Sequence, residues 1–230
     1  MESLPLIGEA AIITGGASPT QNEVNSRMAA YASYSGLICI DVESWEANTA
    51  QYVADNSTIP TAVAKYADLT AKLRIACPYA TFGHFEIGVR NEYTNVLSAT
   101  NSANYLNWQS ANTAYGSIGS FVDCVFPCLY EFNTTLADWL TIAGRIQSEI
   151  ARTLPGKKVY PFLWPLYYAV TSAGNGPIDG VTWRSMLDFC TSNFDGVVLW
   201  SGSLSGNWDR TFPWWCKTQE WIGPLPVDYR

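Results

Sequence analysis

The sequence predicts an α/β protein, a distorted TIM-like (β/α) barrel with fewer than eight complete βα units. Three observations support this prediction. The chain has 230 residues, a length that α/β barrels commonly use for one domain. Hydrophobic residues make up 48% of it, enough for a full core. Short β-rich runs alternate along the whole chain with longer segments of helical character, which is the pattern of βα units.

Each strand candidate is followed by a helix candidate. In chain order, the pairs are strand 10–15 with helix 22–33, strand 36–42 with helix 61–76, strand 80–89 with helix 103–118, strand 121–132 with helix 136–154, strand 157–168 with helix 181–193, and strand 196–202 with helix 216–223. The strand candidates are nearly continuous apolar runs, which is typical of parallel strands covered on both faces. A doubly wound sheet is disfavoured, because residues 14–20 carry neither a G-x-G-x-x-G turn nor a P-loop lysine.

The chain is expected to form a single domain over residues 1–230. No low-complexity run or proline-rich linker divides it. The tryptophan-rich C-terminal segment, about residues 204–230, is expected to pack on the barrel.

Charge and composition exclude several classes of function. The net charge is −7 and no basic run occurs, which argues against nucleic acid as a partner. No apolar stretch is long enough to span a membrane and the first ten residues do not form a signal peptide, so we expect a soluble chain, with secretion left open. His84 is the only histidine and the cysteines form no C-x-x-C pair, so neither a metal nor a cofactor is expected.

Two carboxylates at one strand end form the strongest candidate for a catalytic site. Asp41 and Glu43 close the run GLICIDVESW and are spaced i, i+2, so on a strand both side chains point to the same face. In barrels the catalytic groups lie at the C-terminal ends of strands. Two close carboxylates, one of them kept protonated, are the arrangement that glycoside hydrolysis uses.

Other strand ends add aromatic and acidic residues, which together predict a sugar pocket. They are Glu86, Tyr130, Glu131, Trp164, Tyr167, Tyr168 and Trp200. Rings with polar edges around an acidic pair suit a carbohydrate, whose faces are apolar and whose rim is polar. No G-x-S-x-G elbow accompanies His84, so a serine hydrolase is disfavoured.

Four ordered segments resemble the strand signatures of the hyaluronidase family. They are IDVESW (40–45), FVDCVFPCLYEFN (121–133) with AGRIQSEIA (143–151), KKVYPFLWPLYY (157–168) and FDGVVLWSGS (194–203). The resemblance implies a distorted barrel that cleaves β-1,4 bonds next to N-acetylhexosamine with retention, as an endo-β-N-acetylhexosaminidase. It also implies that the substrate's own 2-acetamido oxygen, rather than a protein group, attacks the anomeric carbon.

The resemblance also assigns roles to individual residues. Glu43 is implied as the proton donor, Asp41 as the carboxylate that orients the acetamido group, and Tyr130 as a third member of the catalytic set. The substrate-binding residues on positions of the family's motifs are Trp45, His84, Phe85, Trp164 and Trp200. The strand-end residues Glu86, Glu131 and Tyr168 complete the expected substrate-binding set. The chain departs from the family where His84 and Phe85 replace paired tyrosines and where Glu46 and Glu131 replace arginines.

These departures make the expected site acidic, so the glycan substrate is expected to be neutral or weakly charged rather than hyaluronan. Two alternatives remain beside the substrate-assisted hydrolase. In one, Glu86 or Glu131 serves as a second catalytic carboxylate. In the other, the barrel is a carbohydrate-binding or structural module without activity.

Overall fold

The computed structural model describes residues 3–13, 16–45, 58–132, 135–168, 174, 176–200 and 211–223. Its strands are short and pair in parallel. They are β1 (Leu6–Gly8), β2 (Leu37–Asp41), β3 (Thr81–His84), β4 (Cys124–Val125), β5 (Lys158–Val159), β6 (Phe162–Leu163) and β7 (Val198–Leu199). The α/β class with parallel strands that the sequence predicts is therefore confirmed.

The strands lie side by side in the order in which they occur along the chain. β1, β2 and β3 form one sheet, while β4 pairs with β5 and β6 pairs with β7. Single bridges from Phe85 to Phe126 and from Cys128 to Phe162 carry the same parallel order between these pieces. Gly83 permits the approach of β4 to β3, because a Cβ at this position would lie 2.6 Å from the backbone oxygen of Cys124.

The predicted barrel is not closed in the described part of the chain. There, no strand pairing joins β7 to β1, so the parallel array keeps an open seam between its first and last strands. Closure depends on pairing between the two ends of the chain, which apolar patterning within each strand does not specify.

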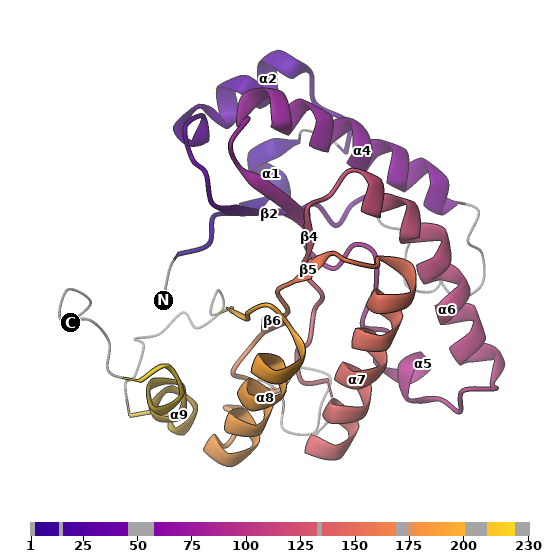
Figure 1. Cartoon of the computed structure of the whole chain (residues 1–230), viewed down its shortest axis with the longest axis vertical. Helices are drawn as coiled ribbons and strands as arrows, with labels where there is room; N and C mark the ends of the chain where they lie inside the picture. The colour runs from indigo at the N-terminus through magenta and orange to yellow at the C-terminus, as the bar shows by residue number, and fades with distance from the viewer. Residues whose placement is uncertain are drawn as a thin grey trace.

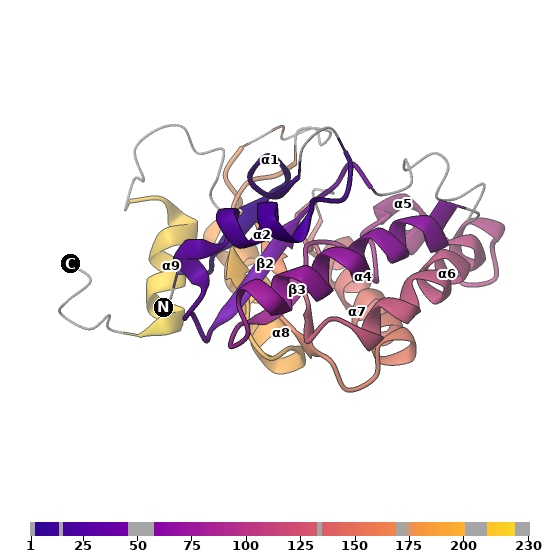
Figure 2. The ribbon, with the colours of Figure 1, turned by 90° about the horizontal axis from the view of Figure 1, so that it is seen from above.

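The helices surround the strands on the outside. They are α1 (Glu9–Ile12), α2 (Gln21–Arg27), α4 (Ile59–Ala76), α5 (Tyr93–Leu97), α6 (Ala103–Tyr115), α7 (Leu136–Thr153), α8 (Gly180–Asn193) and α9 (Pro213–Ile222), with 3-10 turns η1 (Ala29–Tyr31) and η3 (Gly116–Ser120). Figure 1 shows them following one another from α2 and α4 at the top through α6 and α7 to α8 and α9, with both termini on the remaining side. Figure 2 shows α2 and α4 lying over β2 and β3.

Two strand predictions need correction. Residues 10–15 were expected to form the first strand, but β1 covers Leu6–Gly8 and Glu9–Ile12 are helical. Alanine-rich AAIITG is a short apolar run, which sequence alone does not separate into strand or helix. The strand expected over 157–168 is two short strands, and Pro161, which has no N–H to donate, lies between them.

The buried residues form two clusters on opposite faces of the strands. The inner cluster contains Cys39, Phe85, Cys124, Phe126, Cys128 and Phe162, all from strands or the residues close behind them. The outer cluster joins strand residues such as Ile38 and Ile40 to the helices. The outer cluster also includes residues of the last two helices, where Trp183 of α8 packs edge to face against Trp214 of α9, with ring centroids 6.0 Å apart.

The described part of the tryptophan-rich C-terminal segment thus packs on helix α8, whereas residues 204–210 and 224–230 lie outside the described residues. Among the described helices, none is long and apolar enough to cross a membrane.

Candidate active site

The site begins at the end of β2. Along this strand Leu37 and Cys39 belong to the inner cluster while Ile38 and Ile40 belong to the outer one, so the alternation directs Asp41 to the inner face. Asp41 is half-buried, and Glu43, two residues further on, is exposed. One carboxylate is thus recessed and the other is open to an approaching ligand.

Burial raises the pKa of Asp41 to about 6, and the negative charges of Glu43, Glu86 and Glu9 add to the effect. Within the described residues, one oxygen of Asp41, Oδ1, is buried and has no hydrogen-bond donor from the protein. A buried acceptor without a protein donor readily accepts a hydrogen bond from a ligand.

Glu86 lies next to this pair at the end of β3. Its φ angle of +55° is the one positive value at a non-glycine residue in the described structure. Its backbone N–H donates to the oxygen of Phe126 at 2.8 Å, and its Oε1 accepts from the N–H of Asn91 at 3.4 Å. Burial raises the pKa of Glu86 although Arg90 opposes the shift. Strained backbone of this kind clusters at functional sites.

Aromatic rings form a continuous row across the ends of the following strands. Phe85 lies 6.2 Å from Tyr130, Tyr130 lies 5.8 Å from Trp164, and Trp164 lies 5.9 Å from Tyr168, all between ring centroids. Burial and the nearby negative groups raise the pKa of Tyr130, so its hydroxyl stays protonated and able to donate. Trp164 is 8% exposed and its Nε1 has no hydrogen-bond partner in the part of the chain that the structure describes, whereas Tyr168 is 36% exposed.

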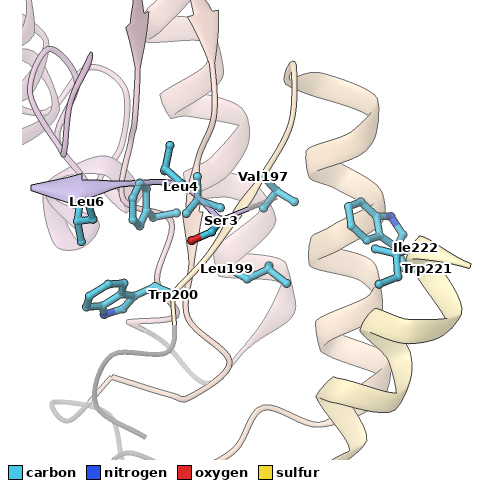
Figure 3. Close-up of a pocket in the computed structure, with 10 residues that line it drawn as sticks. Ser3, Leu4, Leu6, Val197, Leu199, Trp200, Trp221 and Ile222 are labelled. Atoms are coloured by element: carbon cyan, nitrogen blue, oxygen red, sulfur yellow. The ribbon is translucent and has the colours of Figure 1, made fainter. Parts of the chain in front are cut away.

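Trp200 follows β7 at the open seam. It packs against the inner cluster and lines a cavity of about 440 Å³ that also touches Leu6 of β1 and Trp221 and Ile222 of α9. Figure 3 shows Trp200 and Leu6 on one side of this cavity and the α9 residues on the other. The seam left by the unclosed barrel is therefore apolar and hollow.

The structure places several expected site residues away from this group. His84 points to the outer face, where its Nε2 lies 2.8 Å from Thr70 Oγ1 of α4, and burial lowers its pKa to about 3. Trp45 is buried in the outer cluster and donates from Nε1 to the oxygen of Gly16 at 2.7 Å. Glu131 is 1% exposed, and Glu46 lies outside the described residues.

Tyr167 leans outward too, packing against the outer cluster. The residues that come together are thus Asp41, Glu43, Phe85, Glu86, Tyr130, Trp164 and Tyr168, with Trp200 at the seam.

Two residues beside the carboxylates, Glu9 and Tyr66, are not among those that the sequence predicts for the site. Glu9 directly follows β1, and placing the first strand at 10–15 hid its position at a strand end. Tyr66 lies in the middle of α4 and reaches the loop after β2 with its hydroxyl, a contact between distant segments that carries no local signal.

Comparison with known proteins gives no match to a protein-family model and none to a curated protein sequence. Solved structures do match. A monoclinic crystal structure of bee venom hyaluronidase aligns with a TM-score of 0.58 and 15% sequence identity, covering 88% of this chain and 72% of that one. The same enzyme in complex with a hyaluronic acid tetramer gives the same TM-score and identity, with 70% of its chain covered. At this identity the match establishes a shared, hyaluronidase-like fold.

Proposed function

We propose that this protein is a glycoside hydrolase that cleaves glycans containing N-acetylhexosamine. The observation that carries the proposal is the pairing of an exposed Glu43 with a recessed Asp41, whose pKa burial raises to about 6, at a strand end beside a row of aromatic rings. The hyaluronidase-like fold supports it, since a protein of that fold holds a hyaluronic acid tetramer.

In the proposed reaction the substrate supplies its own nucleophile. Glu43 protonates the glycosidic oxygen while the acetamido carbonyl oxygen attacks the anomeric carbon, so the C–O bond breaks and a cyclic oxazolinium forms. Asp41 accepts a hydrogen bond from the acetamido N–H, and Tyr130 donates one to the same group. Water then attacks the anomeric carbon and gives a proton to Glu43, while the bond from that carbon to the acetamido oxygen breaks. These steps restore the acetamido group and the enzyme, with retained configuration.

The charge of the site favours a neutral or weakly charged glycan. The negative charges of Glu43, Glu86 and Glu9 raise the pKa of Asp41, and the charge of Arg90 opposes the rise in the pKa of Glu86. A uronate at this position would meet several like charges in a partly desolvated cleft, which costs affinity. Tyr168 and Trp164 offer apolar faces to the sugar rings on either side of the cleaved bond.

The test is product release from chitin oligosaccharides, peptidoglycan, chondroitin and hyaluronan by the unaltered chain and by Glu43→Gln. We expect one of the first two polymers to be cut fastest and the variant to release no product, because glutamine keeps the shape but has no proton to donate. Equal turnover by the variant would refute the role of Glu43. Sugar binding without cleavage of any polymer would identify a carbohydrate-binding module instead.

A second mechanism is favoured by one observation, the strained Glu86 beside the pair. There Glu86 would act as the nucleophile and form a covalent glycosyl-enzyme. A 2-fluoro glycoside that labels Glu86, detected by mass spectrometry, would establish this mechanism. Competitive inhibition by a thiazoline analogue of the oxazolinium, without labelling, would establish substrate assistance.

A further inference from the structure

The loop that carries Asp41 and Glu43 is tied down at three points by distant parts of the chain. The backbone oxygen of Val42, between the two carboxylates, accepts from the Tyr66 hydroxyl at 2.6 Å. The backbone N–H of Ser44 donates to Glu9 Oε2 at 2.9 Å. The Trp45 indole donates to Gly16 at 2.7 Å. Five consecutive residues are thus bracketed by α4, α1 and the segment after α1.

Close packing holds the Tyr66 side chain in one position. It is fully buried in α4, and its ring meets Trp45 edge to face at 5.4 Å on one side and His84 at 5.0 Å on the other. His84 is in turn hydrogen-bonded to Thr70, one helical turn along α4. A side chain packed in this way cannot change rotamer without disturbing its neighbours, so its hydroxyl fixes the position of Val42.

Glu9 holds the other side of the loop. Its pKa is lowered by the Ser44 hydroxyl and by the backbone N–H groups of Ser44 and Glu43, so the carboxylate is ionised at neutral pH and accepts from this turn. Charge-assisted hydrogen bonds of this type are stronger than neutral ones. The N–H of Glu43 is one of the groups that lower the pKa of Glu9. Glu9 therefore acts directly on the backbone of the proposed proton donor.

We infer that Tyr66 and Glu9 are positioning residues that clamp the loop of Asp41 and Glu43 from opposite sides. The inference rests on the proposed function, because the clamp matters for catalysis only where Glu43 transfers a proton. Neither residue contacts substrate. Their effect is on geometry, and a misplacement of a proton donor by about 1 Å costs roughly a hundredfold in rate.

The experiment compares Tyr66→Phe and Glu9→Ala with the unaltered chain on the polymer it cleaves. Tyr66→Phe removes one hydroxyl and keeps the packed ring. We expect kcat to fall roughly tenfold to a hundredfold in each variant with KM changed less than about twofold. Glu9→Gln should recover part of the loss, because its amide oxygen still accepts one N–H. Amide hydrogen exchange of Glu43 and Ser44 should quicken in Glu9→Ala and in Tyr66→Phe.

Two matched controls separate positioning from a general loss of stability. Thr218→Val removes a buried hydroxyl in α9 that accepts from the Trp183 indole, and Glu23→Ala removes a carboxylate that caps α2. Both should lower the melting temperature and leave kcat and the loop amides near their original values. The inference is overturned if the controls lower kcat as much as the test variants, or if the loop amides exchange at unchanged rates. If the unaltered chain cleaves no glycan, the proposed function fails and the exchange rates alone decide the clamp.

Discussion

The two halves of the strand array present different chemistry at their C-terminal ends. β1 to β3 form one continuous sheet, and the residues that follow these strands are acidic: Glu9, Asp41, Glu43 and Glu86. β4 to β7 occur as strands of two residues, and aromatic side chains follow them: Tyr130, Trp164, Tyr168 and Trp200. In the proposed mechanism the three-stranded sheet carries the proton donor, Glu43, and the two-residue strands carry the aromatic rings proposed to bind the sugar.

This difference has a physical basis. Proton transfer needs groups held in one geometry, and the ladder between β2 and β3 together with the Tyr66 and Glu9 hydrogen bonds supplies it. Stacking against a sugar ring depends on area more than on exact placement, so the row from Phe85 to Tyr168 needs less backbone order. The predictions below test whether changes in the acidic half alter turnover while changes in the aromatic half alter binding.

After Glu43→Gln, Asp41→Asn should have the largest effect, lowering turnover while raising stability. Loss of the acetamido-orienting charge should lower kcat by about a hundredfold to a thousandfold. Because the folded pKa of about 6 lies above the unfolded value, the unaltered protein loses stability as pH rises between about 4 and 6, and the asparagine variant does not. The variant's melting temperature should therefore exceed that of the original at pH 7 and approach it at pH 4.

Asp188→Asn is the control for Asp41→Asn, since Asp188 lies on the surface in an ion pair with Arg184. It should leave turnover unchanged, and its melting temperature is the reference against which that of Asp41→Asn is compared. A pH-independent difference in melting temperature for Asp41→Asn would contradict the shifted pKa.

Tyr168→Ala should weaken binding and leave the chemical step nearly unchanged. Tyr168 ends the aromatic row at 36% exposure, so its loss removes a stacking surface without opening the core. We expect a Kd for oligosaccharide raised roughly fivefold to thirtyfold, about 1–2 kcal/mol, measured by calorimetry. Tyr79→Ala, a change at a tyrosine that is 68% exposed after α4, should leave Kd unaltered. If Tyr168→Ala lowered kcat by a larger factor than it raised KM, the division into an acidic half for turnover and an aromatic half for binding would be wrong.

A comparison of two substitutions at Glu86 should show the smallest difference, a change in stability. The comparison measures the energetic cost of the strained backbone at this position. Glu86→Ala and Glu86→Gly both remove the buried charge, but only glycine also accommodates φ +55° without strain. The glycine variant should be more stable than the alanine variant by about 1 kcal/mol in urea unfolding. Equal stability of the two variants would show that the backbone at this position carries no strain.

Several elements were predictable from local sequence signals. α7 and α8 are preceded by the N-cap residues Thr135 and Asp179, whose side chains accept from backbone N–H groups of the first helical turn. The i, i+2 spacing of Asp41 and Glu43 after an apolar strand predicts that the two side chains lie on one face. The alternation of side chains along β2 directs Asp41 to the inner face.

The errors arose where the outcome depends on distant partners. The orientation of His84 follows from its place opposite Ile40 in the β2–β3 register, and both residues face the helices. The sequence around His84 and Phe85 does not determine which of the two side chains faces inward. A shift of one residue in strand register would move each of them to the opposite face of the sheet. Long-range packing likewise determines where β1 lies, whether the first and last strands pair, and which residue the Tyr66 hydroxyl contacts.

The central claim is that Glu43 supplies the proton and the aromatic row supplies the affinity. It is tested most directly by measuring turnover and oligosaccharide Kd together for the unaltered chain and Glu43→Gln, on the polymer that the unaltered chain cleaves. The account predicts that the variant loses at least about a thousandfold in kcat and keeps its Kd within about twofold. Turnover retained, or turnover and binding lost in parallel in a folded variant, would contradict it.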